Sequence, residues 1–466
     1  MPSVCFYFQI HQPNRLKHYS YFDIGHVEEP FSDEKNGQIM RKVANKSYLP
    51  ANRKILELIK RHQGRFRVSY SISGVAIDQM KRYAPEVLDS FKELAATGAV
   101  EFMAETYYHT LASVCDEDEF REQINMHCNL MKETFGVTPT IFRNTELIYN
   151  DRIGQIISDM GFKGMIAEGA DDVLGWRSPN FVYRLPNSDL RLLLKNYKLS
   201  DDIAFRFSNS SWDNYPLTAP KFAYWVHQAS GNGETINLFM DYETFGEHQW
   251  EDTGIFNFLD YLPDAIFAHP HWDFATPSEV IERYEPKAEL HFTRTVSWAD
   301  IDRDLTAWAG NRMQRRAISE AFALGQEVRT CQTPAVLDHW RKLQTSDHFY
   351  YMCTKWFADG DVHAYFSPYQ SPYDAFINYM NALTNFKENV LEKEKRRMAE
   401  LAASQPIIEA QEIYDREILP VTERAIKHKQ STKIKGGKKD KSKPSQISEI
   451  SPQPIEKEMN VSARSH

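Results

Sequence analysis

The chain has 466 residues, of which 42% are hydrophobic and 13% aromatic, so it has enough apolar material for a large core. It is longer than one ordinary domain, and its mean hydropathy of −0.55 excludes a protein embedded mainly in a membrane. The net charge of −9 argues against a phosphate-binding surface over the whole protein.

The first segment, MPSVCFYFQIHQP, has no basic region, and its apolar run ends too early for a signal sequence or a membrane span. The five cysteines are widely spaced and form no CxxC pair. They therefore indicate neither a disulfide framework nor a zinc ribbon. These features predict a cytoplasmic protein.

Over about the first 290 residues, short apolar runs alternate with segments of helical period. The predicted strands are Val4–Gln9, Arg67–Ile72, Val100–Ala104, Thr140–Arg143, Gly164–Ile166, Leu190–Leu194 and Ile236–Met240. The predicted helices include Asn52–Arg61, Glu86–Thr97, Glu117–Phe135, Asp151–Met160 and Asn257–Ala268. This alternation is typical of βα units around a parallel sheet. Seven such strands favour a barrel, although periodicity alone does not separate a barrel from an open sheet.

From about Trp298 the strand signals fade. Helical spacing predicts helices at Arg312–Leu324, Ala335–Gln344, Tyr373–Leu383 and Asn385–Ala403. We therefore predict a first domain at 1–290, a helical domain at 291–420 and a disordered, basic tail at 421–466. Between Arg424 and Lys443 the tail has nine Lys or Arg and one acidic residue. It has no aromatic residue there, so we favour a solvated segment over a specific nucleic-acid site.

Two carboxylates are predicted at strand ends. Glu146 follows the strand TIFRN, and Asp241 ends the strand ETINLFM. In βα-barrels, catalytic groups project from this end of the strands. Paired carboxylates are what glycoside hydrolysis requires. The alternative is that each acid only caps a helix.

Three further segments carry candidate residues. His11 ends a strand, where a histidine is either a ligand-binding or a structural residue. GAVEFMAETYYH places Glu101 and Glu105 around a strand, where one of these acids either accepts hydrogen bonds from sugar hydroxyls or lies in a solvated turn. SWADIDRDLTAW combines Trp298, Asp300 and Trp308, a mixture suited to sugar stacking or, equally, to a helix start with two core tryptophans.

The ordered segments FQIHQP, GAVEF, FRNTEL, MDYETFGEH and WADIDRDLTAW resemble the five characteristic segments of glycoside hydrolase family 57, most closely its α-amylase type. The resemblance covers about Pro2 to Gly310. It implies an incomplete (β/α)7 barrel followed by a helical bundle, and a retaining mechanism on α-linked glucans. Neither a metal nor another cofactor is expected.

The resemblance also implies roles for residues. Glu146 stands at the position of the nucleophile and Asp241 at that of the acid/base, with their carboxyls about 5–5.5 Å apart for retention. His11, Glu101 and His248 are expected to bind the sugar. Two tryptophans and an aspartate are expected to reach the cleft from the second domain; they are Trp298, Asp300 and Trp308.

Three alternatives remain open. A glucanotransferase uses the same intermediate but passes the sugar to a hydroxyl group. A non-catalytic glucan-binding homologue is disfavoured because both carboxylates are present. A metal-dependent enzyme is suggested by His269, His271 and Asp273 in HPHWD, but the strand-end ligands that such enzymes use are not recognisable.

Overall fold

The computed structural model describes residues 2–27, 29–355, 367–413, 416 and 420. The predicted disordered tail from residue 421 onward lies outside the described residues. Contacts divide the chain into a compact unit, Met1–Arg396, and a second unit, Arg397–His466. The fold described here is that of the first unit.

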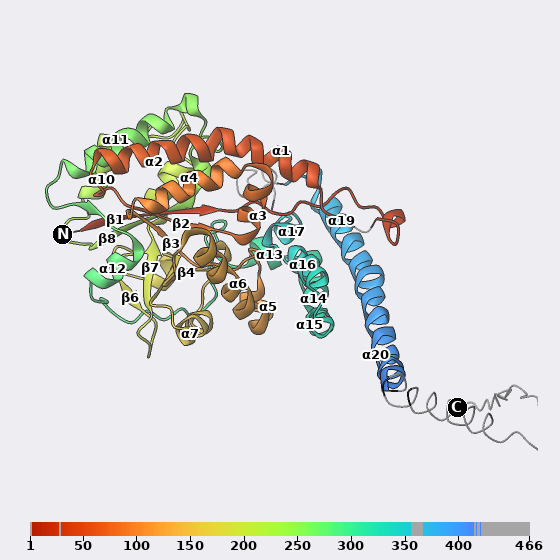
Figure 1. Cartoon of the computed structure of the whole chain (residues 1–466). Helices are drawn as coiled ribbons and strands as arrows, with labels where there is room; N and C mark the ends of the chain where they lie inside the picture. The colour runs from red at the N-terminus through yellow and green to blue at the C-terminus, as the bar shows by residue number, and fades with distance from the viewer. Residues whose placement is uncertain (1, 28, 356–366, 414–415, 417–419, 421–466) are drawn as a thin grey trace, which may run out of the picture. The chain divides into compact units, whose positions relative to one another are not determined.

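Two sheets form the centre of the first unit (Figure 1). The first has the order β3-β2-β1-β8, with β9 also paired to β1, and all its strands are parallel. Its strands are β1 (Ser3–Ile10), β2 (Val68–Ile72), β3 (Val100–Phe102), β8 (Thr235–Asp241) and β9 (Asp273–Phe274).

The second sheet has the order β4-β5-β7-β6. Its strands are β4 (Ile141–Arg143), β5 (Gly164–Glu168), β6 (Tyr183–Arg184) and β7 (Arg191–Lys195), and only the short β6 is antiparallel. A parallel bridge between Ala104 and Phe142 joins the two sheets. On the other side, Asn196 N donates to Asn237 O at 2.9 Å.

All seven predicted strands are present, within a few residues of the expected bounds; β6 and β9, of two residues each, were not predicted. Full burial explains the apolar composition of β1, whose eight residues are all buried. In parallel sheets covered on both faces, strands are near-continuous apolar runs.

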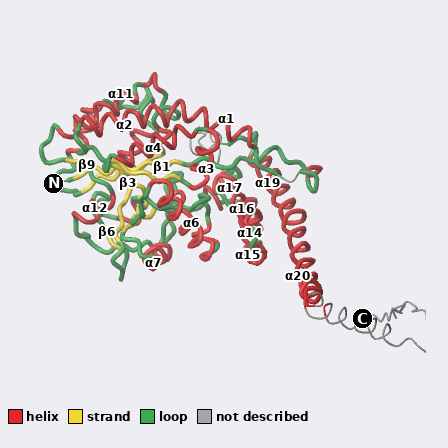
Figure 2. Tube along the Cα trace, viewed as in Figure 1, coloured by secondary structure: helices red, strands yellow, loops and turns green. Residues whose placement is uncertain are grey.

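The helices of the first part lie around these sheets (Figure 2). They are α1 (Asp33–Val43), α2 (Leu49–Arg61), α3 (Gly74–Tyr83), α4 (Pro85–Ala96), α5 (Ala112–Cys115), α6 (Glu117–Phe135), α7 (Asp151–Asp159), α8 (Asp171–Leu174), α9 (Tyr197–Ala204), α10 (Ala219–His227), α11 (Ile255–Phe267) and α12 (Pro277–Arg283). A π-helical turn, η2 (Ala44–Tyr48), joins α1 to α2, and 3-10 turns lie at η1 (Tyr21–Asp23), η3 (Thr145–Leu147), η4 (Tyr242–Thr244) and η5 (Glu251–Thr253).

After residue 300 the described structure is helical. The helices are α13 (Thr306–Ala309), α14 (Arg312–Ala323), α15 (Gly325–Cys331), α16 (Pro334–Leu343), α17 (Ser346–Tyr350), α19 (Pro372–Asn385), the π-helical η6 (Phe386–Leu391) and α20 (Glu392–Ile413). These helices confirm the helical period predicted for this part of the sequence.

Sequence signals set the helix ends. The Asp116 side chain accepts from Glu119 N at the start of α6, and Gly136, with φ 72°, ends that helix. Ser73 caps α3 in the same way, by accepting from Ala76 N. Because α3 directly follows β2, this cap fixes the Ser73 hydroxyl at the carboxyl end of the first sheet.

Among the described residues, the core has three clusters. The largest lies between β1, β2 and β8 and the helices α2, α4, α10 and α11. A smaller cluster contains residues of both sheets, including Tyr7, Ile166, Leu193 and Phe239. The two sheets therefore share one buried interior, and their carboxyl ends open at the same side of it. The α/β class is confirmed.

Candidate active site

A cavity of about 560 Å³ lies at the carboxyl ends of the strands. Its lining includes Gln9 of β1, Lys195 of β7 and Asp241 of β8, together with Glu146, which follows β4. The chain after residue 290 contributes further residues, such as Trp298 and Asp300 from a loop and Asp347 from α17. Six of the eight predicted site residues line this cavity: His11, Glu146, Asp241, His248, Trp298 and Asp300.

Glu146 is held in a left-handed backbone conformation, with φ 57° and ψ 24°. Such a conformation costs a residue other than glycine about 1–3 kcal/mol, so the surrounding contacts must impose it. Trp298 provides two of these contacts. Its backbone N donates to Glu146 O at 3.1 Å, and its indole Nε1 donates to Glu146 Oε2 at 2.7 Å.

The other carboxylate oxygen of Glu146 contacts two donors. His109 Nε2 lies 3.2 Å from Oε1, and the Ser346 hydroxyl donates to the same oxygen at 3.3 Å. Together with the Trp298 indole, these groups hold both oxygens in place. Pre-positioned hydrogen bonds of this kind favour the ionised form of a carboxyl.

His109 lies between two carboxylates. Its Nδ1 is 3.1 Å from Glu105 Oε2, while its Nε2 contacts Glu146. Burial lowers the pKa of His109, but the hydrogen bonds to Glu105 and Glu146 outweigh burial and raise that pKa to about 9. Burial would raise the pKa of Glu105, yet His109 lowers it to about 2. At neutral pH His109 is therefore an imidazolium that donates to both carboxylates.

The two predicted catalytic carboxyls have opposite pKa shifts. For Glu146, burial favours the neutral form, but the hydrogen bond and charge of His109 and the charge of Arg143 lower its pKa below the usual value. For Asp241, burial raises the pKa to about 6, and the negative charge of Glu146 adds to this effect. Separated pKa values allow one carboxyl to act as a base or nucleophile and the other as an acid.

Arg143, the last residue of β4, is a fully buried cation below these carboxyls. None of its guanidinium nitrogen atoms has a hydrogen-bond partner among the described residues. The guanidinium lies 5.0 Å from the centre of the Trp298 ring. Its charge lowers the pKa of Glu105, Glu146 and Asp241.

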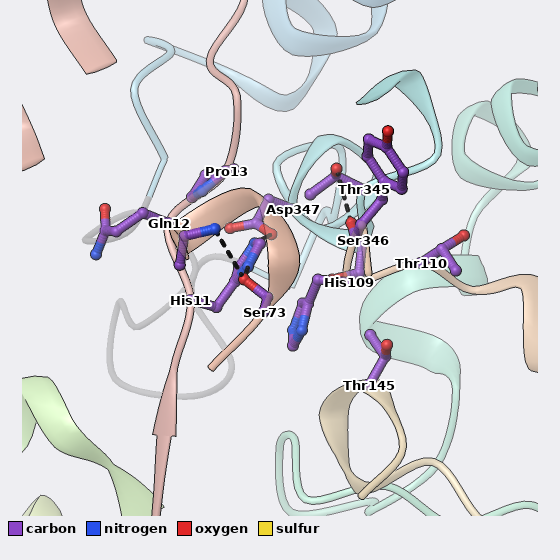
Figure 3. A network of polar contacts seen from close by, with 12 residues as sticks. His11, Gln12, Pro13, Ser73, His109, Thr110, Thr145, Thr345, Ser346 and Asp347 are labelled. Atoms are coloured by element: carbon purple, nitrogen blue, oxygen red, sulfur yellow. Dashed lines mark hydrogen bonds and ion pairs between the residues drawn. The ribbon is translucent and has the colours of Figure 1, made fainter. Parts of the chain in front are cut away.

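His11 joins the first sheet to the helical part of the chain (Figure 3). Its Nδ1 lies 2.7 Å from Ser73 Oγ, and its Nε2 lies 3.1 Å from Asp347 Oδ2. The Asp347 carboxylate can only accept, so the His11 proton lies on Nε2, and the Ser73 hydroxyl donates to Nδ1 of the neutral ring. Burial, and then the charge of His109, lower the pKa of His11, so this ring is neutral.

A second acid lies close to Asp241 along the chain. Glu243 accepts from Gln12 Nε2 at 3.2 Å and from the Tyr48 hydroxyl. Burial and the negative charge of Asp241 raise its pKa to about 8. His248 also lines the cavity, and burial lowers its pKa to about 4.

Asp300 lines the cavity, and Lys355 Nζ donates to its Oδ2 at 3.2 Å and to Asp302 Oδ2 at 2.6 Å. Trp308 does not line the cavity. It is 1% exposed and belongs to the apolar core with Tyr350. Trp308 is therefore a core tryptophan, which was the alternative interpretation of this segment, and it does not reach the cleft.

Glu101 also lies outside the cavity lining. It is in the middle of β3, below the strand end, where its Oε2 accepts from Ser278 N and Ser278 Oγ, both at 3.0 Å. The carboxylate that reaches the site from this segment is Glu105, through its contact with His109.

Sequence reasoning missed several residues of the site: His109, Arg143, Lys195, Glu243 and Asp347. Arg143 and Lys195 end β4 and β7, so their strand-end position was a usable signal. His109 follows β3 by seven residues, and Asp347 comes from the short helix α17, so only the tertiary structure brings them to the cavity.

Among the described residues, no group of three or more His, Cys, Asp or Glu side chains is arranged to hold a metal ion. In the HPHWD segment, the Asp273 carboxylate binds Arg283 Nη1 at 2.8 Å and accepts from Ser3 Oγ at 2.6 Å. The Asp273 carboxylate therefore belongs to an ion pair with Arg283. No helix in the described part of the chain is long and apolar enough to span a bilayer.

A cavity at the ends of parallel strands, lined by two carboxyls whose pKa values shift in opposite directions, provides what glycoside hydrolysis requires. Residues 5–293 match the model of Glycosyl hydrolase family 57. The chain belongs to this family, as the resemblance of its motifs indicated, and it is a glycoside hydrolase.

Individual relatives differ in activity. A protein of Methanocaldococcus jannaschii with the name "Putative alpha-amylase" is 46% identical over 401 residues, which are 84% of this chain and 85% of the relative. The structure of a 4-alpha-glucanotransferase from Thermococcus litoralis has a TM-score of 0.56 at 15% identity, over 75% of this chain but 56% of its own. A branching enzyme from Pyrococcus horikoshii has a TM-score of 0.58 at 14% identity, over 78% of this chain and 87% of its own. At these identities the two structures show a shared fold.

Proposed function

We propose that this protein cleaves α-1,4-glucosidic bonds in starch- or glycogen-type glucans or maltooligosaccharides, as an α-amylase-like retaining enzyme. Glu146 is the nucleophile and Asp241 the general acid/base. The observation that carries the proposal is the opposite pKa shift of these two carboxyls in one cavity. The 46%-identical relative supports the α-amylase type.

In the first step, a Glu146 carboxylate oxygen attacks the anomeric carbon while the Asp241 carboxyl gives its proton to the glycosidic oxygen. The bond to the leaving sugar breaks and a covalent glycosyl ester forms. In the second step, the Asp241 carboxylate takes a proton from water, whose oxygen attacks the same carbon. Glu146 leaves as a carboxylate and Asp241 is protonated again.

The surrounding residues support these steps. Trp298 Nε1 and Ser346 Oγ each bind one Glu146 oxygen, so attack requires little reorganisation. His11, His248 and Asp300 line the cavity within reach of a bound sugar. Trp298 offers an aromatic ring that suits the C–H face of a pyranose.

We propose that the two sheets form an incomplete (β/α)7 barrel, domain 1–290, and that the helices of 291–420 form a second domain, a helical bundle. The Ala104–Phe142 bridge, the Asn196–Asn237 hydrogen bond and the shared buried interior support a closed ring of strands. The five cysteines are free, which supports a reducing compartment such as the cytoplasm.

The proposal is tested by a time course on maltoheptaose and on soluble starch. Product size is read by chromatography and the anomeric configuration of the first product by NMR. We expect shorter chains, a net increase in reducing ends and the α-anomer first. A first product in the β-configuration would overturn retention.

Transfer is the second candidate, because a solved structure that shares the fold is a 4-alpha-glucanotransferase. The two outcomes differ in water use. Hydrolysis creates one new reducing end for each bond cleaved, whereas transfer leaves their number constant and makes chains longer than maltoheptaose. The same time course therefore decides between them.

A further inference from the structure

We propose that an α-1,4-glucan chain binds at a second site on the surface, in a groove beside α9 and α10. This inference rests on the proposed function, since it concerns the polymeric substrate. The groove encloses about 430 Å³ and is open to solvent. Its lining residues are Leu199, Asp202, Arg206, Trp212, Asn214 and Trp225.

Two tryptophans form one wall of the groove. The Trp212 and Trp225 ring centres are 6.0 Å apart and their planes meet at 73°. Both side chains are only partly buried, so part of each indole remains available to a ligand. Indole rings cover the apolar C–H face of a pyranose. Successive glucose units of an α-1,4 chain are turned relative to one another, whereas a β-1,4 chain is flat. Two ring planes that meet at a steep angle therefore suit an α-1,4 chain better.

The polar side chains of the groove are held in place by the protein. Arg206 Nε donates to Asp202 Oδ1 at 2.6 Å, and Arg206 Nη2 donates to Lys198 O at 2.9 Å. The Asp202 carboxylate therefore balances the Arg206 guanidinium within the groove. A groove without net charge favours a neutral ligand with hydroxyl groups over an anion.

The groove and the active-site cavity share a wall. Asp201 and Phe205 line the cavity, while Asp202 and Arg206, the next residue in each case, line the groove. Phe205 is 59% exposed at this boundary. A long chain bound in the cavity can therefore continue across Phe205 into the groove, whereas a short oligosaccharide ends before it.

Binding is tested in the Glu146→Gln protein, so that the polymer is not degraded. Affinity electrophoresis in gels with glycogen measures retardation for Trp212→Ala and Trp225→Ala. Trp176→Ala is the matched control, because Trp176 is 90% exposed and lines neither the cavity nor the groove. We expect each groove variant to weaken glycogen binding about three- to tenfold, the range that one aromatic contact provides.

A second readout uses the active enzyme. The ratio of kcat/KM on glycogen to kcat/KM on maltopentaose should fall in the groove variants and stay constant in Trp176→Ala. Barley β-glucan, a β-linked polymer, should cause no retardation in any variant. Because Trp212 and Trp225 pack against the core, their replacement can also disturb the fold. Asn214→Glu is therefore a further variant, at an exposed position that lines the groove, where it adds a negative charge and a longer side chain.

Unchanged glycogen retardation in Trp212→Ala, Trp225→Ala and Asn214→Glu would overturn the second site. An equal fall of both kcat/KM values, with their ratio constant, would also overturn it, because the residues would then act on the cavity or on the fold. Failure of the proposed function is a separate result: the unmodified enzyme would act on neither glycogen nor maltopentaose.

Discussion

The imidazole rings of His11 and His109 are stacked, with ring centres 4.0 Å apart and 14° between their planes, yet their pKa values shift in opposite directions. His109 contacts two carboxylates and has a pKa of about 9, whereas burial and the His109 charge lower the pKa of His11. One charged and one neutral ring can stack, while two charged rings would repel. At neutral pH the stacked pair therefore carries a single positive charge, on His109.

Replacing Glu146 by Gln should remove catalysis and keep the fold. The amide has the same shape but cannot form the glycosyl ester, so kcat should fall by at least about 10³-fold. Activity on maltoheptaose and the circular dichroism spectrum are the measurements. Glu101→Gln is the matched control, because Glu101 is a partly buried, hydrogen-bonded carboxylate outside the cavity. Equal losses in the two variants would contradict the assignment.

The pH profile should reflect the Asp241 pKa of about 6. Asp241 must be protonated in the first step, so kcat/KM should fall as the pH rises through about 6. Asp241→Asn should remove this alkaline limb. It should also lose far less activity on a maltosyl fluoride than on maltoheptaose, because fluoride needs no acid to leave. An unchanged alkaline limb in Asp241→Asn would assign the acid to another residue.

Loss of the His109 charge should move the acidic limb of the profile. In His109→Gln the cation that lowers the Glu146 pKa is gone, so the acidic limb should shift to higher pH and kcat should fall. Glu105→Gln should shift the limb in the same direction by a smaller amount, because it removes one of the two partners that keep His109 protonated. The comparison is His227→Gln, which lies outside the cavity lining. Rate loss without a pH shift in both variants would indicate a structural role alone.

Stability should also depend on the protonation of His109. Its folded-state pKa of about 9 is above the value of about 6.5 for an unfolded histidine. Its contribution is therefore fully present below pH 6.5 and is lost as the pH rises through about 9. The Tm of the unmodified protein should fall between pH 6.5 and 9 more steeply than that of His109→Gln, as calorimetry at several pH values can measure. Parallel Tm curves would refute this contribution.

Local sequence signals predicted much of the framework. The seven predicted apolar runs form seven parallel strands, because the apolar composition of each segment reflects its burial. Glu146 and Asp241 lie at or just after strand ends, as expected. Trp308 and Glu101 show the limit of this reasoning. A tryptophan suits an apolar core as well as a sugar site. A carboxylate in the middle of a strand, such as Glu101, does not reach a cavity at the end of that strand.

Contacts between distant segments could not be predicted. His109 contacts Glu146, 37 positions further along the chain, and Asp347 contacts His11, 336 positions away. No periodicity links such residues, since only the packing of complete elements sets their distance. The charge of His109 depends on such contacts, and the neutrality of His11 depends on burial and on the charge of His109, so the electrostatics of the site also lay beyond the sequence.

The Glu146 carboxylate depends on groups from late in the chain, Trp298 and Ser346. During synthesis on the ribosome, residues 1–290 emerge first, with both proposed catalytic carboxyls but without these partners. The nascent chain therefore carries an incomplete site until residue 346 has left the exit tunnel. Under the proposed mechanism, a chain that ends before Ser346 lacks one of the two groups that contact Glu146 Oε1.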